Sequence, residues 1–248
     1  MEANIKYTQK QYWDARFSTE AAYEWLASWS ELRALILPFL PRDAAILIIG
    51  NGNSALPVDL SRDAPSATIL STDYSAVAIS RAQAAGGPGN VTHAVADMLD
   101  LETALGSARF DVVIDKGALD ALVAVGGDSW TPAATTYSTA RRVCEGVVRV
   151  LKPKGVYLGI SFSQPHFRLP LLLQKHEADG RGEDAVVKRE EESSDDGEWE
   201  PDLTPGVVTS AVLSASMAQN LDGTAWSACD VIPVNAGLGY FMYALRSR

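Results

Sequence analysis

The sequence predicts an α/β fold built on a mostly parallel sheet, because apolar runs typical of buried strands alternate with helical segments. The first such run, residues 45–49, is Ala-Ile-Leu-Ile-Ile, with no polar break. Such a run is typical of a strand that is buried on both faces of a parallel sheet. Four more strands are predicted at residues 67–71, 91–95, 110–115 and 156–161. Because strands that alternate with helices form βαβ units, these five strands are expected to run parallel.

A glycine-rich turn, Gly50-Asn-Gly52, ends the first strand. Glycine permits a tight turn and lets the backbone approach a ligand without a Cβ in the way. Asn53 or Ser54 is then predicted to cap the helix that follows. Strand, turn and helix N-terminus together predict a nucleotide-type site, in which backbone N–H groups point at a polar ligand.

An aromatic-rich segment precedes the first strand, and we expect residues 1–41 to form a helical cover over one face of the sheet. Trp13 and Phe17 have helical spacing, and residues 30–38 form an amphipathic pattern with Ser30 as the predicted cap. Because Trp13 lies outside any strand core, a lid over a ligand is the alternative.

Two later helices have clear end signals. Ser75 is predicted to cap a helix that runs to residue 85. A longer helix is predicted over residues 132–151, where Lys152-Pro-Lys-Gly155 is a strong stop signal.

The last third of the chain differs in composition. Residues 181–205 carry ten acidic and three basic side chains, which predicts a flexible surface insertion. Order is expected to return at residues 207–217. Two apolar runs, residues 225–234 and 239–245, predict a terminal hairpin added to the sheet. We expect one domain over residues 1–248.

Composition restricts the class of partner. The chain has 21 basic and 31 acidic residues, a net charge of −10, so nucleic acid is a poor partner and a basic protein or cationic small molecule fits better. Its two cysteines, Cys144 and Cys229, form no disulfide framework and no zinc motif. No apolar run approaches the roughly 18 residues that span a bilayer, and the first residues lack a signal-peptide core. We therefore expect a cytoplasmic protein with no metal, membrane or nucleic-acid partner.

The turn motif fits two nucleotide-type ligands. Gly50-x-Gly52-x-x-Ala55, followed by Asp73, is compatible with NAD and with S-adenosylmethionine, because in both cases an acid after the second strand binds the ribose hydroxyls. Three features favour S-adenosylmethionine. A second mononucleotide-binding half is missing after the fifth strand, Asp97 follows the third strand where it can face an adenine edge, and the terminal hairpin is typical of a seven-stranded methyltransferase sheet.

Six motifs carry a more specific resemblance over roughly residues 7–170. They are Tyr12-Trp-Asp-Ala-Arg-Phe17, Tyr23-Glu-Trp25, Ile49-Gly-Asn-Gly-Asn-Ser54, Thr72-Asp-Tyr-Ser75, Asp115-Lys-Gly-Ala-Leu-Asp120 and Ser163-Gln-Pro-His-Phe-Arg168. In this order they resemble the methyltransferase-like 13 family, whose members include lysine methyltransferases of translation elongation factor 1-alpha. The chain departs from the family at Asn51, where relatives usually carry Cys, and at Phe17, where Tyr is common. The resemblance implies a Rossmann-like, seven-stranded sheet with an antiparallel C-terminal strand.

The resemblance also implies where the cofactor binds. Asp73 and Tyr74 would hold ribose and adenine, the N-terminal aromatics would close over the cofactor, and Lys116 would lie in its site. By its own chemistry, Asp97 can accept a hydrogen bond from the adenine amine, and Met98 can pack on the ring. The predicted cofactor-binding residues are Trp13, Phe17, Trp25, Gly50, Asn51, Gly52, Asp73, Tyr74, Asp97, Met98 and Lys116.

Methyl transfer from a sulfonium is an in-line displacement, so positioning contributes most of the catalysis. Asp115 and Asp120 are expected to flank the acceptor as the catalytic carboxylates and to orient it or take its proton. His166 is a candidate base or an ordinary helix-start histidine, and no role is assigned to His93 or His176.

The sequence thus predicts an S-adenosylmethionine-dependent protein lysine methyltransferase, with elongation factor 1-alpha as its possible substrate. A small-molecule methyltransferase and a non-catalytic cofactor-binding scaffold are the alternatives, and a dehydrogenase is a more distant one. No Asn/Asp-Pro-Pro-aromatic motif follows the fourth strand, which argues against amino-group methylation of adenine, cytosine or glutamine.

Overall fold

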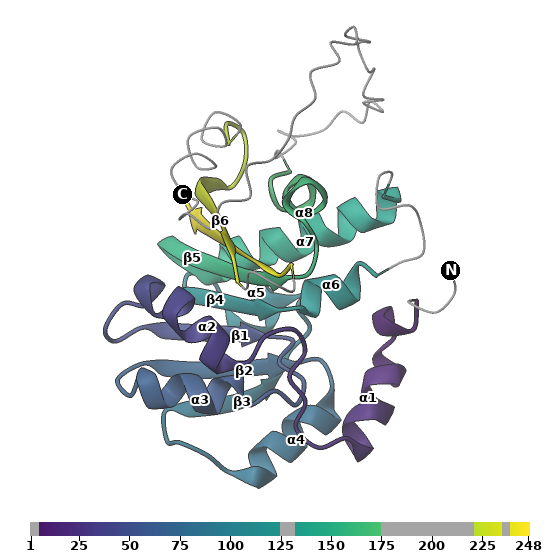
Figure 1. Ribbon diagram of the computed structural model, residues 1–248, viewed down its shortest axis with the longest axis vertical. Helices are drawn as coiled ribbons and strands as arrows, with labels where there is room; N and C mark the ends of the chain where they lie inside the picture. The colour runs from purple at the N-terminus through teal and green to yellow at the C-terminus, as the bar shows by residue number, and fades with distance from the viewer. Residues whose placement is uncertain (1–4, 125–131, 175–220, 235–238) are drawn as a thin grey trace, which may run out of the picture.

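A seven-stranded sheet crosses the centre of the molecule (Figure 1). The structure, a computed structural model, describes residues 5–124, 132–174, 221–234 and 239–248. In chain order, the strands are β1 (Ala45–Ile49), β2 (Thr68–Asp73), β3 (Val91–Val95), β4 (Phe110–Lys116), β5 (Leu151–Ser161), β6 (Trp226–Pro233) and β7 (Phe241–Ser247). Their spatial order is β3-β2-β1-β4-β5-β7-β6. Strands β1 to β5 pair in parallel and β7 is antiparallel to both neighbours, which confirms the predicted methyltransferase-type Rossmann-like sheet.

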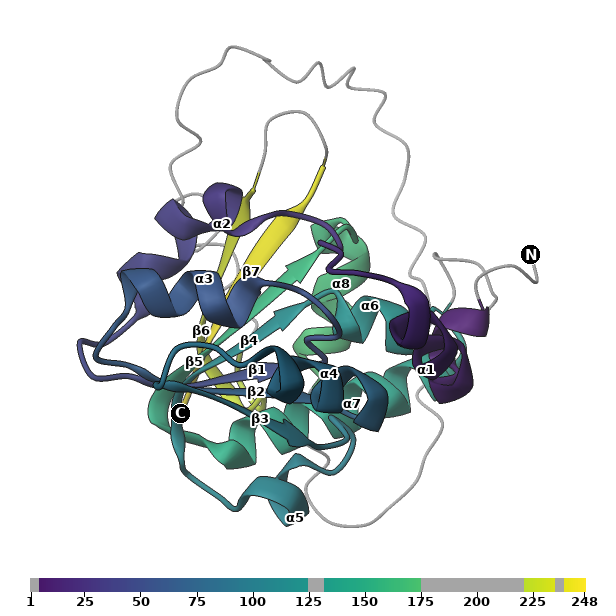
Figure 2. The same ribbon diagram turned by 90° about the horizontal axis from the view of Figure 1, so that it is seen from below.

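Helices cover both faces of this sheet (Figure 2). They are η1 (Ile5–Thr8), α1 (Lys10–Thr19), α2 (Trp29–Ile36), η2 (Leu37–Phe39), α3 (Leu56–Asp63), α4 (Ala76–Ala85), α5 (Leu101–Leu105), α6 (Ala118–Leu122), α7 (Ala134–Val150) and α8 (Pro165–Leu172). On β1, Ile46 and Ile48 pack against α2 and α3, whereas Leu47 and Ile49 pack against α5 and α7. All four side chains are at most 1% exposed, so the prediction of a strand buried on both faces is confirmed.

The order of the strands places a crevice beside β1. The chain leaves β1 toward β2 and β3 on one side and then continues with β4 and β5 on the other. At such a switch point, the crossover helices diverge and open a crevice at the carboxyl ends of the strands. The N-terminal segment divides there: α2 packs on one face of the sheet, while α1 lies by the strand ends with α6 nearby (Figure 1).

Of the three predicted helix caps, the one at Ser30 is wrong and the other two are met wholly or in part. Helix α2 begins at Trp29, and its cap is Ser28, whose backbone N–H donates to the Glu31 carboxylate at 2.8 Å in a capping box. Helix α3 begins after Ala55 rather than Asn53 or Ser54, but the Ser54 hydroxyl still accepts from the Leu56 N–H at 3.1 Å, so this prediction is met in part. By contrast, Ser75 caps α4 as predicted, and its hydroxyl accepts from the Ala78 N–H.

The segment Lys152-Pro-Lys-Gly155 follows the end of α7, as predicted, but it belongs to the next strand and does not separate the helix from it. Strand β5 begins at Leu151, and residues 152–155 lie inside it. The register against β4 jumps from Phe110↔Leu151 to Val112↔Val156, and Lys154 has φ +65°, so the extra residues form a bulge. Helices α5 and α6, with five residues each, were not predicted, because so short a segment has no measurable period.

The terminal hairpin is confirmed as β6 and β7. The predicted insertion at residues 181–205 and the ordered segment at residues 207–217 lie outside the described residues. In the described part of the chain, no helix combines the length and the apolar character needed to cross a membrane.

Candidate active site

A cavity opens at the carboxyl ends of β1, β2 and β4 and encloses about 930 Å³ of empty space, its solvent-open mouth included. All eleven residues predicted to bind the cofactor line it. The lining also includes residues that were not predicted, among them Tyr7, Arg16, Tyr23, Ala121 and Leu122. The strand ends, the glycine turn and the N-terminal aromatics therefore share one site.

The glycine turn needs both of its glycines. Gly50 has φ +57° and Gly52 has φ +56°, a backbone region that side-chain-bearing residues rarely adopt. A Cβ on Gly50 would lie 2.3 Å from the Ala118 Cβ, and one on Gly52 would lie 2.8 Å from the Phe17 ring. The turn is thus tightly covered by α6 on one side and α1 on the other.

Asp73 joins this turn to α4. Its carboxylate is 3% exposed and accepts from the Gly52 N–H and the Ser75 N–H, both at 2.8 Å. Burial raises the pKa of Asp73, and the two backbone hydrogen bonds oppose that shift. A carboxylate has about four acceptor positions, so each oxygen can still accept from a ribose hydroxyl.

The next two strand ends form the wall predicted to face adenine. Tyr74 is partly buried, and burial raises the pKa of its hydroxyl. Met98 is 9% exposed, so its thioether is available mainly to the cavity. Asp97 is exposed, and its Oδ1 accepts from the Leu99 N–H at 2.9 Å. This wall offers an apolar surface and a carboxylate side by side.

The aromatic cover is one connected cluster. Trp13 stacks on Phe17 with ring centroids 5.5 Å apart and meets Trp25 edge-on at 5.9 Å. A Cβ on Gly117, which has φ +81°, would lie 2.7 Å from Trp25, so this indole packs directly on the end of β4. These three aromatics pack against each other as core residues do, and they also line the cavity.

A clasp between Glu24 and Lys116 fastens this cover, and Glu24 was not predicted. The Glu24 carboxylate accepts from the Ala55 N–H, the Ser54 hydroxyl and the Lys116 ammonium, each at 2.8 Å. Lys116 also donates to the Trp25 carbonyl at 2.7 Å. Glu24 therefore adds a polar contact at the start of α3, where the Ser54 hydroxyl also accepts from the Leu56 N–H at 3.1 Å, and it ties the cover to β4.

Both members of the clasp have shifted pKa values. Burial of Glu24 favours its neutral form, but the hydrogen bond and charge of Lys116, with help from Ser54 and Ala55, outweigh burial and lower the pKa of Glu24. Burial lowers the pKa of Lys116, and Glu24 offsets part of that shift. With 9% exposure, Lys116 is a buried member of the site and does not reach into solvent.

The two predicted catalytic carboxylates do not line this cavity. Asp115 is 2% exposed and accepts from the Ala118 N–H at 2.8 Å and the Tyr157 hydroxyl at 3.0 Å. Burial raises the pKa of Asp115, and the Tyr157 hydrogen bond opposes that shift. Asp120 is 4% exposed and pairs with Arg168. Both carboxylates are paired with protein groups, as buried charges require, so the expected role of Asp115 and Asp120 beside the acceptor stays a prediction.

Neither of the two histidines that the structure describes contributes a base to the cavity. His166 lies in the first turn of α8, and His93 on β3 has its pKa lowered by burial. Neither lines the cavity, and His176 is outside the described residues. Within the described ranges, no cluster of three His, Cys, Asp or Glu side chains could hold a metal ion.

Comparison with known proteins agrees with this geometry. Residues 42–200 match the protein family described as a methyltransferase domain. EEF1A lysine methyltransferase 4 of Mus musculus is 36% identical over 178 residues, which are 68% of this chain and 66% of that protein. The protein of the same name from Bos taurus is 37% identical over 185 residues, 71% of this chain and 69% of that protein. The human mitochondrial citrate synthase-lysine N-methyltransferase is 30% identical over 178 residues, 64% of this chain and 70% of that protein. This chain therefore belongs to the methyltransferase-domain family and is a class I S-adenosylmethionine-dependent methyltransferase.

Proposed function

We propose that this protein transfers a methyl group from S-adenosylmethionine to a lysine of a protein substrate, with translation elongation factor 1-alpha as the first candidate. The observation that carries the proposal is the aromatic cover, which closes the cofactor-type cavity with Tyr7, Trp13 and Trp25. The relatives support the same class of acceptor, because their names specify lysine methylation of EEF1A or citrate synthase.

The residues of the cavity fit the proposed cofactor. The glycine turn lines the cavity, and Asn51 Oδ1 is buried there without a partner among the described residues. Asp73 offers ribose acceptors, while Met98 and Asp97 offer a ring surface and a carboxylate. When bound, S-adenosylmethionine supplies a methyl group on a positively charged sulfur.

The aromatic cover suits a lysine acceptor, which must lose its proton before it can react. With a pKa near 10.4, the free amine costs about 4.6 kcal/mol at pH 7, at roughly 1.36 kcal/mol per pKa unit. Removal of water by the surrounding rings lowers that pKa, because desolvation disfavours the ammonium. A dedicated strong base is then unnecessary, which agrees with Asp115 and Asp120 lying outside the cavity lining.

A basic protein is the proposed partner, in keeping with the net charge of −10. A cytoplasmic location remains a prediction from the sequence.

The test is transfer of labelled methyl groups from S-adenosylmethionine into a cell extract, followed by mass spectrometry of each labelled band. We expect a labelled lysine in a protein of the size of elongation factor 1-alpha. Label confined to small molecules would overturn the proposal in favour of a small-molecule methyltransferase. A protein that binds the cofactor and labels nothing would instead be a scaffold.

A further inference from the structure

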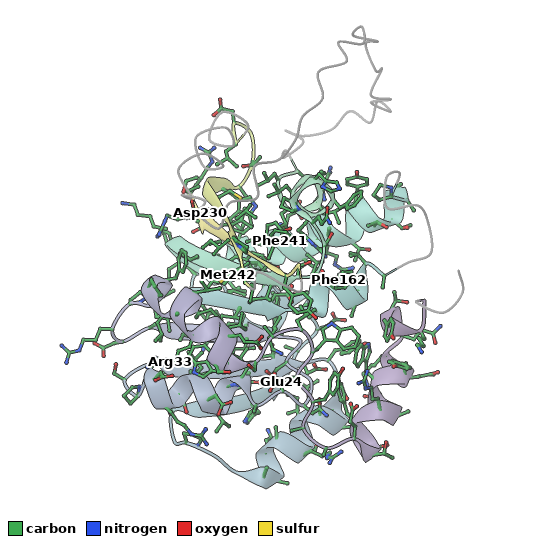
Figure 3. All side chains as sticks on the ribbon, in the orientation of Figure 1. Glu24, Arg33, Phe162, Asp230, Phe241 and Met242 are labelled. Atoms are coloured by element: carbon green, nitrogen blue, oxygen red, sulfur yellow. The ribbon has the colours of Figure 1, made fainter. Side chains whose placement is uncertain are left out.

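An exposed phenylalanine stands at the end of β5, beside α6 (Figure 3). Phe162 is 53% exposed, whereas the preceding residue, Ser161, is 4% exposed. A single exposed apolar side chain is ordinary, but the backbone that carries this one is unusually well fixed. Whether the Phe162 ring has a role in binding is therefore judged from the contacts that fix its backbone and from its place relative to the cavity.

Hydrogen bonds hold the backbone on both sides of Phe162. The Phe162 N–H donates to Asp120 Oδ2 at 3.2 Å, and the Ser163 N–H donates to the Ser161 hydroxyl at 2.9 Å. The Tyr243 hydroxyl donates to the Ser163 carbonyl at 2.5 Å. With these contacts, the turn presents the ring from a rigid base.

A buried ion pair anchors this base. Arg168 Nη2 bonds both Asp120 Oδ1 and the Ser161 hydroxyl, and Ser161 donates to Asp120 Oδ1 at 2.7 Å. Arg168 is 3% exposed, and its Nε and Nη1 have no partner among the described residues. A buried pair with unsatisfied nitrogens contributes little net stability, because desolvation offsets the attraction. The Asp120–Arg168 pair is thus better explained by the geometry that it fixes in the turn around Phe162 than by a gain in folding stability.

The anchored turn adjoins the cavity without being part of its lining. Asp120 lies on α6, and the two residues that follow it, Ala121 and Leu122, line the cavity. The Ile160 carbonyl accepts from the N–H of Gly117, another lining residue, at 3.0 Å. A small molecule confined to the cavity would leave Phe162 untouched, whereas a protein that inserts a side chain there would cover the surface around it.

We propose that Phe162 is a docking contact for the protein acceptor and that the Asp120–Arg168 pair is the positioning device that holds it. The inference rests on the proposed function, because a protein acceptor is what extends beyond the cavity. An aromatic ring on a fixed backbone loses little conformational freedom on binding, which is why such residues often dominate protein interfaces. The two sequence motifs that end in Asp120 and in Arg168 thus meet in one device.

The test compares Phe162→Ala with Val95→Ala, a matched control. Val95 is 54% exposed and ends another strand, β3, of the same sheet. The KM and kcat of methyl transfer to the labelled protein, the cofactor Kd by calorimetry and the Tm are measured for both variants. We expect Phe162→Ala to raise KM for the acceptor about tenfold with kcat, cofactor Kd and Tm unchanged, while Val95→Ala matches the wild type.

A second variant separates positioning from folding. Arg168→Lys keeps the charge but cannot bond Asp120 and Ser161 in the same planar geometry, so we expect KM to rise with an unchanged cofactor Kd. If the wild type labels a protein lysine and Phe162→Ala keeps the wild-type KM, the inference is overturned and the proposed function stands. If the wild type labels only small molecules or nothing, both fall together.

Discussion

The Glu24–Lys116 clasp makes the sharpest prediction, because one substitution releases the cover and leaves the cavity lining intact. Glu24→Gln keeps the shape of the side chain and one oxygen acceptor but removes the charge that Lys116 pairs with at 2.8 Å. The Lys116 side chain is 5% exposed, so its ammonium would stay buried with neutral acceptors alone, the Trp25 carbonyl and the glutamine oxygen. We expect the closed cover to become less stable and the cofactor to bind more weakly.

The size of the effect follows from the exposure of the pair. Removal of one partner from a fully buried ion pair costs about 3–5 kcal/mol. The Glu24 side chain is 32% exposed and glutamine retains one acceptor, so about 2 kcal/mol is a suitable figure here. At about 1.4 kcal/mol per factor of ten, the closed-to-open ratio falls roughly 30-fold. That factor is the upper limit on the rise in cofactor Kd; it is approached when the open state already dominates in the unliganded wild type, and the rise is smaller the more the wild type is closed.

Calorimetry with S-adenosylmethionine at pH 7 measures this rise. Asp63→Asn is the matched control, since Asp63 bonds Arg33 in an ion pair that joins α2 to α3 away from the cavity. A cofactor Kd for Glu24→Gln within twofold of the wild-type value, with Asp63→Asn also unchanged, would show that the clasp does not control cofactor affinity.

Three further predictions test other parts of the site and fold. Asp73→Ala should abolish measurable cofactor binding by calorimetry, and unchanged affinity would refute the ribose assignment. The same substitution should lower the free energy of unfolding by about 1–3 kcal/mol in denaturant, because two backbone N–H groups lose their acceptor. Gly52→Ala should weaken cofactor binding far more than Gly86→Ala, because both glycines have positive φ but only a Cβ at Gly52 would meet Phe17. Equal losses of cofactor affinity would mean that backbone strain alone is responsible. The hydrogen bond from Arg33, followed by that from Trp29, lowers the pKa of Asp63 from 3.8 to about 2. A carboxyl whose pKa is lower in the folded state contributes stability above pH 3.8, and this stability is lost as the pH falls through about 2. The Tm difference between the wild type and Arg33→Gln should therefore shrink between pH 4 and 2. A constant difference would contradict the ion pair.

Prediction from sequence succeeded where a local pattern determines the structure. The run at β1 is apolar at every position, and the structure buries both of its faces. Ser75 follows a strand and precedes a helical segment, and it caps α4. Asp73 and the glycine turn lie near each other because parallel strands end at the same edge of a sheet, which the alternation of strands and helices already implied.

The sequence did not reveal contacts between distant segments. Glu24 meets Ser54 and Lys116, 30 and 92 residues away, and no period or spacing connects the three positions. Asp120 was placed correctly after β4, but its orientation depends on Arg168, 48 residues further along the chain. One clue was present, since the two motifs that end in Asp120 and Arg168 carry opposite charges and stand after neighbouring strands.

The contacts between the N-terminal cover and the sheet explain how a cavity can be both closed and accessible. The cover is attached through polar links: Asp14 accepts from the Ser75 hydroxyl at 2.5 Å, Glu24 pairs with Lys116, and Arg81 donates to the Phe17 carbonyl. Each link ends on an element beside the cavity, and the aromatic rings of the cover pack on each other and, through Phe17 and Trp25, on the glycine turn and the end of β4. Polar links of this kind exchange with water at modest net cost, whereas a cover fused to the apolar core would have to be unfolded. If the cover opened to admit the cofactor, these polar links would break, whereas the contacts among its aromatic rings could be kept.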